Sequence, residues 1–100
     1  MPRIRMNIQV TQLKKRAIPT LKKYGVRGAF VFGSFSRGDF TKKSDVDLLI
    51  DFPPGASLFD AIGLQHELEK KLGRDVDVVS KRGIKPRFAK YIEGDLIRIL

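Results

Sequence analysis

Three short apolar runs alternate with amphipathic segments along this sequence, and this alternation is the feature that most constrains its fold. The runs are rich in β-branched and aromatic residues, which is typical of buried strands, and they cover residues 29–33, 46–52 and 75–80. In the other segments apolar residues recur every three or four positions, which predicts helices over residues 11–24, 57–73 and 86–93. We expect Thr11 to cap the first helix and Pro19 to kink or shorten it.

Length and composition limit the chain to a small number of protein classes. Its 100 residues suffice for one domain, residues 1–100, and 42% hydrophobic with 31% charged residues is ordinary for a soluble globular protein. The absence of cysteine excludes disulfides and thiolate sites, and the single histidine, His66, excludes a histidine-based metal cluster. Neither a signal peptide nor an apolar stretch of the ~18 residues needed to span a membrane is present, so we expect a cytoplasmic protein without a membrane segment.

The charge balance points to polyanionic partners. Twenty Lys and Arg residues against eleven Asp and Glu residues give a formal charge of +9, which suits nucleotides, RNA or an acidic protein. The positive residues are scattered through the chain, and no recognisable RNA-binding module is present. An RNA-directed role is therefore kept as an alternative.

A Gly-Ser turn follows the first apolar run. Gly33 permits close approach of the backbone to a ligand, and Ser34 adds a hydroxyl donor. If Ser34 opens a helical turn, the free backbone N–H groups at its start suit the phosphates of a nucleoside triphosphate. Arg37 would then lie near the same phosphates, where its planar guanidinium could bind their oxygens.

Aspartates lie within or next to the second and third apolar runs. Residues two apart on a strand share a face, so Asp45 and Asp47 are expected to project together, and paired carboxylates suit Mg²⁺. If the third run pairs beside the second, Asp77 joins them, and three carboxylates can hold two metal ions for phosphoryl displacement. Asp75 shares a face with Asp77 and is the alternative third carboxylate, but it stands at the start of its strand. Asp51 is interpreted as a strand-end surface residue.

Taken together, these residues resemble a known signature. Gly33-Ser34, ten residues, then Asp45-Val46-Asp47 is similar to the signature of the DNA polymerase beta-type nucleotidyltransferase superfamily. Within that superfamily, the short length and the segments 33–38, 44–49 and 76–79 resemble minimal nucleotidyltransferase (MNT) domains. The resemblance implies the palm-like nucleotidyltransferase fold of the α/β (α+β) class, with a small mixed β-sheet flanked by helices.

The same resemblance implies a function. It implies magnesium-dependent transfer of a nucleoside monophosphate, commonly AMP from ATP, to an acceptor hydroxyl. Gly33 and Ser34 would bind the donor phosphates, Asp45 and Asp47 the two Mg²⁺ ions, and Asp77 the ion nearer the acceptor. Family members of this size often act as antitoxins that adenylylate or bind an all-helical HEPN toxin, so a protein acceptor of that kind is expected. The alternatives are an antitoxin that acts by contact alone and an RNA-directed nucleotidyltransferase.

Overall fold

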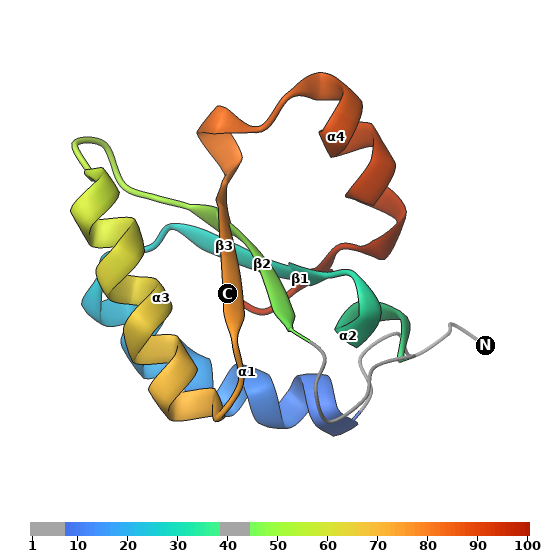
Figure 1. Ribbon diagram of the computed structural model, residues 1–100, viewed down its shortest axis with the longest axis horizontal. Coiled ribbons are helices and arrows are strands. Elements are labelled where there is room, and N and C mark those ends of the chain that lie inside the picture. The colour runs from blue at the N-terminus through green and yellow to red at the C-terminus, as the bar shows by residue number, and fades with distance from the viewer. Residues whose placement is uncertain (1–7, 39–44) are drawn as a thin grey trace.

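The computed structural model of the chain describes residues 8–38 and 45–100 (Figure 1). Four helices and four strands account for most of this part. In chain order they are α1 (Ile8–Lys23), β1 (Gly28–Phe32), α2 (Ser34–Arg37), β2 (Val46–Asp51), α3 (Leu58–Leu72), β3 (Val76–Ser80), α4 (Pro86–Ile92) and β4 (Ile97–Arg98). Two 3₁₀ turns flank α4, namely η1 (Lys81–Gly83) and η2 (Glu93–Asp95).

The four strands form one mixed sheet in the order β3-β2-β1-β4. Strand β1 runs antiparallel to β2 and β4, whereas β2 and β3 run parallel and are joined by α3. This agrees with the general rule that parallel neighbours need a long crossover connection, usually helical. The mixed sheet flanked by helices confirms the predicted fold class.

Helices cover the two faces of the sheet unequally. On one face the buried side chains of Val31, Leu48 and Ile50 belong to the main core, which also contains Leu21 of α1 and Leu64 of α3. The opposite face carries a smaller cluster of three buried residues, Phe32, Leu49 and Ile92. The last of these comes from α4. Because alternate residues of a strand point to opposite faces, the aspartates of β2 and β3 lie on this second, less covered face.

Helix α1 differs from its prediction. The expected shortening at Pro19 is wrong, since α1 is continuous from Ile8 to Lys23 with Pro19 inside it. Pro19 is exposed, and Ala17 and Leu21 on either side of it are buried in the core. That burial offsets the one backbone hydrogen bond that proline removes. Because α1 begins earlier than predicted, Thr11 lies inside the helix and is not its cap.

The prediction for the second long helix is confirmed by α3. The Ser57 N–H donates to Asp60 Oδ2 at 2.8 Å as part of a capping box, and Gly73 ends the helix in the left-handed conformation with φ 68°. None of the helices in the described part of the chain is long and apolar enough to cross a membrane.

Candidate active site

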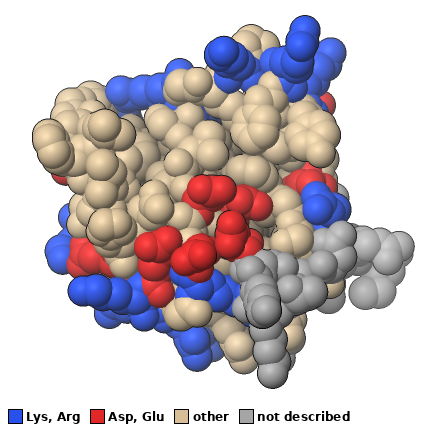
Figure 2. Space-filling view, in the orientation of Figure 1, with Lys and Arg blue, Asp and Glu red and all other residues tan. Residues whose placement is uncertain are grey.

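The candidate site is centred on Asp47, which lies on the inner strand β2 and on the less covered face of the sheet. In the strand register Asp47 lies between Phe32 of β1 and Asp77 of β3, so these three side chains share a face. Asp45 stands one residue before β2 and is exposed. Figure 2 shows acidic side chains gathered at the centre of this face, with Lys and Arg around its edge.

The electrostatics of Asp47 show which charges surround it. Burial raises the pKa of Asp47, and the Asp77 and Asp45 carboxylates raise it further, while the Arg37 guanidinium opposes them. Asp45, Asp77 and Arg37 are therefore each close enough to Asp47 to act on its carboxylate. Asp47 is partly buried beside two like charges, and such an arrangement is unfavourable unless a cation compensates it.

Gly33 closes the site on the β1 side. Its backbone, at φ 76° and ψ −150°, occupies a region that is open essentially to glycine alone. A Cβ atom added there would overlap Asp47 Oδ2, so the missing side chain lets the end of β1 lie directly against that carboxylate. Ser34 follows as the first residue of α2, and the Arg37 N–H donates to the Gly33 carbonyl oxygen at 3.1 Å. Gly33 and Asp47 thus meet at the junction of β1 and α2, where Ser34 begins the helix.

Arg37 is held by a residue that the sequence reasoning missed. Its Nη1 donates to Asp95 Oδ2 at 2.7 Å, although the two residues are 58 positions apart. The Ser36 hydroxyl donates to the backbone oxygen of Asp95, so η2 binds α2 at two points. No local pattern in the sequence marks Asp95 as the partner of Arg37, because the contact depends on how the C-terminal segment returns to β1.

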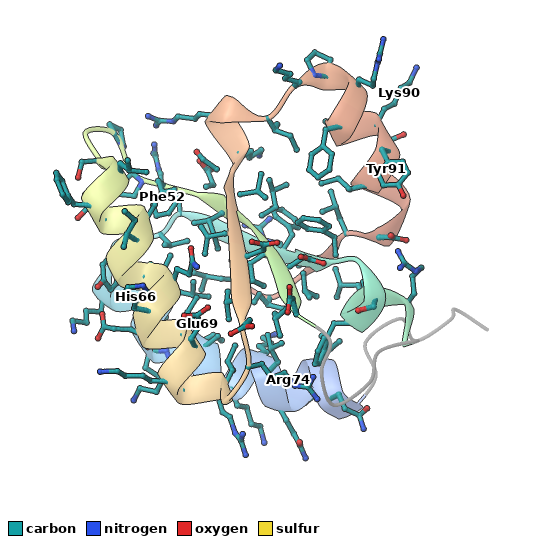
Figure 3. The ribbon with its side chains drawn as sticks, viewed as in Figure 1. Phe52, His66, Glu69, Arg74, Lys90 and Tyr91 are labelled. Carbon is teal, nitrogen blue, oxygen red and sulfur yellow. The ribbon has the colours of Figure 1, made fainter. Side chains whose placement is uncertain are left out.

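Asp75 and Asp77, the two candidates for the third carboxylate, lie in different positions relative to β3. Asp77, on β3, is the register partner of Asp47, whereas Asp75 precedes β3 and accepts a hydrogen bond from the Val46 N–H through its backbone oxygen at 2.9 Å. Glu69 of α3 supports the same strand start, because its Oε2 accepts the Val76 N–H at 3.0 Å. Figure 3 shows Glu69 directed from α3 toward β3. These bonds fix where β3 begins and hence the position of Asp77.

Within residues 8–38 and 45–100, no group of three or more His, Asp or Glu side chains is placed so that it could hold a metal ion as it stands. The donor chemistry nevertheless suits a hard divalent cation, because Asp45, Asp47 and Asp77 offer only carboxylate oxygens. The like charges that raise the pKa of Asp47 are those that such a cation would compensate. By donor chemistry and electrostatics, then, the residues fit Mg²⁺.

Comparison with known proteins decides the family. Residues 14–99 match the family described as nucleotidyltransferase domain. The chain belongs to this family. The sequence is 37% identical over 93 residues to a Methanocaldococcus jannaschii protein named as a candidate protein adenylyltransferase, and the match covers 93% of the chain and all of that protein. The resemblance drawn from the motifs is therefore confirmed, and the chain is a nucleotidyltransferase.

Solved structures agree with this nucleotidyltransferase fold. A structure described as a candidate minimal nucleotidyltransferase is 34% identical, has a TM-score of 0.77, and is matched over 88% of the chain and 90% of its own length. A complex described as a tri-AMPylated Shewanella oneidensis HEPN toxin with an MNT antitoxin matches with a TM-score of 0.73 at 18% identity, over 93% of the chain and 72% of the other. The second likeness concerns the fold alone.

Proposed function

We propose that this nucleotidyltransferase is a magnesium-dependent protein adenylyltransferase, which moves AMP from ATP to a hydroxyl group of a partner protein. The observation that carries the proposal is the register pairing of Asp47 with Asp77, beside Gly33 and within electrostatic reach of Asp45 and Arg37. The relative from M. jannaschii is named for the same activity. We expect the reaction to take place in the cytoplasm, where ATP is supplied.

The reaction is a displacement at the α-phosphorus of ATP. The acceptor oxygen forms a bond to the α-phosphorus, and the bond from that phosphorus to the bridging oxygen of pyrophosphate breaks. The acceptor proton passes to a carboxylate of the site, for which Asp77 is proposed below. Pyrophosphate leaves with the electron pair of the broken bond. Such a reaction requires positioning of the two oxygens in line and compensation of the phosphate charge.

The residues divide between the two reactants. Gly33 and Ser34 would bind the donor phosphates through the turn between β1 and α2, and Arg37 would bind a phosphate oxygen with its guanidinium. Asp45, Asp47 and Asp77 would hold two Mg²⁺ ions, which supply charge compensation for the phosphates and the departing pyrophosphate.

The acceptor is expected on the β3 side of the site. Strand β3 is an edge strand, and Asp77 on it is exposed, so an acceptor hydroxyl can reach this carboxylate without displacing the sheet. Asp77 is accordingly proposed to bind the metal nearer the acceptor and to help its hydroxyl lose a proton. We propose a HEPN-type toxin as this acceptor, supported by the S. oneidensis complex, which is described as an AMPylated HEPN toxin together with an MNT antitoxin.

The position of the label on ATP tests the proposal. The purified chain is incubated with Mg²⁺ and a lysate of its source, using ATP labelled either on the α-phosphate or on the γ-phosphate. Adenylyl transfer leaves the α-label on a protein band and never the γ-label, and a chelator removes the signal. A γ-labelled band that depends on the added chain would mean phosphorylation and would contradict the proposal.

A second candidate function is an antitoxin that neutralises its partner by contact. The exposed aromatic side chains of Phe88 and Tyr91 favour it, because both offer apolar area that a partner could cover. The discriminating variant is Asp45→Asn, Asp47→Asn and Asp77→Asn combined. If this variant still suppresses the toxicity of the proposed HEPN-type toxin, contact suffices; if suppression is lost while the complex still forms, transfer is required.

A further inference from the structure

Helix α4 exposes two aromatic side chains beside the candidate active site. Tyr91 is 83% exposed and Phe88 is 39% exposed, and their rings stack with centroids 6.4 Å apart at an interplanar angle of 28°. Figure 3 shows Tyr91 and the neighbouring Lys90 on the outer side of this helix. Together with Lys85 and Arg87, the two rings line a shallow hollow of about 330 Å³.

This aromatic pair is connected to the carboxylates by a single side chain. The Phe88 ring meets the Phe32 ring edge to face, with centroids 6.0 Å apart at 80°. Phe32 is the register partner of Asp47 and shares its face of the sheet. A molecule that lies on Phe88 and Tyr91 is therefore placed next to the site that holds the reacting groups.

The surroundings of the pair are basic. Residues 81–92 contain five Lys and Arg residues and no Asp or Glu. In Figure 2 blue side chains stand along the upper edge of the face, above the tan surface and away from the acidic centre. A binding partner whose surface has an apolar centre and acidic residues around it would complement both the exposed rings and the basic residues that surround them.

We propose that the α4 surface, defined as Lys85, Arg87, Phe88, Lys90 and Tyr91, docks the acceptor protein through an acidic surface with an apolar centre. Docking there places the acceptor hydroxyl beside the carboxylates of β2 and β3. The inference rests on the proposed adenylyltransferase function and adds to it the surface that selects the acceptor. Buried aromatic anchors with charged residues around them are the usual source of affinity in protein interfaces.

The charge and the sequence of the chain favour this occupant over two others. A second copy would bring another +9 charge and the same basic helix to the surface, so self-association is opposed by repulsion. No recognisable RNA-binding module is present in the sequence, which disfavours a nucleic acid as the occupant.

The test measures binding without ATP, so it is independent of catalysis. The probe is a fluorescent random copolymer of Glu and Tyr, which is acidic, aromatic and rich in hydroxyl groups, and its binding is followed by anisotropy. The charge variant is Arg87→Glu with Lys90→Glu, and its matched control is Lys70→Glu with Lys71→Glu on α3, which changes the net charge equally at exposed positions. The aromatic variant is Tyr91→Ala, and its control is Phe59→Ala, where the side chain is 84% exposed.

We expect both α4 variants to weaken copolymer binding at least about tenfold and both controls to change it less than about threefold. Equal weakening by variant and control, or no weakening by the α4 variants, would overturn the proposal. So would a single-stranded RNA oligonucleotide that binds more tightly than the copolymer and loses binding in the Arg87→Glu, Lys90→Glu variant. A chain that binds as expected but transfers no label would instead contradict only the proposed function.

Discussion

Replacing Gly33 by alanine is expected to have two effects, one on the backbone conformation and one on the neighbouring Asp47 carboxylate. The first effect is conformational, because the backbone at φ 76° and ψ −150° excludes side chains at a cost of about 1–3 kcal/mol. For a domain of this size that loss lowers the unfolding temperature by roughly 4–24 °C. The second effect is steric, because the new methyl group would overlap Asp47 Oδ2 and displace this carboxylate.

A matched variant isolates the steric effect. Gly73 also has positive φ, 68°, but an added Cβ there meets no atom within 4 Å. Gly73→Ala is therefore expected to cost about 1–2 kcal/mol of stability and to leave label transfer unchanged. Gly33→Ala should destabilise to a comparable extent and also lose most of its transfer activity, because Asp47 is moved.

Thermal unfolding and label transfer from α-labelled ATP, measured below the unfolding temperature of both variants, provide the comparison. If Gly33→Ala retains the transfer rate of Gly73→Ala at equal folded fraction, the close approach of Gly33 to Asp47 has no role in the reaction. That result would refute the reasoning.

Three further outcomes are expected. Asp47→Asn should raise the unfolding temperature at pH 7 in the absence of Mg²⁺. The pKa of Asp47 is higher in the folded state than in the unfolded state, so its ionisation destabilises the fold as pH rises through these two values, and asparagine removes that cost. In thermal scans the gain should therefore shrink toward acid pH, where Asp47 is protonated in both states. Asp95→Asn should reduce the free energy of unfolding by less than about 1 kcal/mol, because its ion pair with Arg37 is partly exposed to solvent. It should nevertheless weaken MgATP binding severalfold in calorimetry, because Arg37 loses its ion pair with Asp95. Ser57→Ala should cost about 1 kcal/mol in urea unfolding through the α3 capping box, with transfer unchanged.

The sequence was sufficient for the features that depend on local pattern. The period of two in Val46–Asp51 placed Asp47 on the face opposite Val46 and Leu48, and the capping residues located both ends of α3. The Gly-Ser turn could be located because it follows an apolar strand directly. In each case the structural cause lies within a few residues of the feature that it produces.

Features that depend on distant contacts could not be predicted in this way. The pairing of Asp47 with Asp77 depends on the parallel register of β2 and β3, which the sequence allowed but did not determine. The bond from Arg37 to Asp95 joins segments 58 positions apart. Strand β4 has only two residues, which are too few to form a periodic pattern in the sequence. It is recognised as a strand only because it pairs with β1.

The outward direction of the aromatic side chains on α4 is another such feature. The helix was predicted, but which of its sides faces the sheet depends on Ile92 joining the cluster of Phe32 and Leu49. Once Ile92 is buried there, Tyr91 is left in solvent. A seven-residue helix offers too few turns for its apolar face to be recognised from spacing alone.

Label transfer by Asp47→Asn, compared with Asp51→Asn, tests the central claim most directly. Both substitutions remove one carboxylate charge from β2, but Asp47 pairs with Asp77 whereas Asp51 pairs with Gly28 at the other end of the strand. We expect Asp51→Asn to transfer α-label at nearly the wild-type rate and Asp47→Asn to be slower by at least about a hundredfold, because a lost metal ligand costs several kcal/mol in the transition state. Equal rates in the two folded variants would contradict the assignment of the active site.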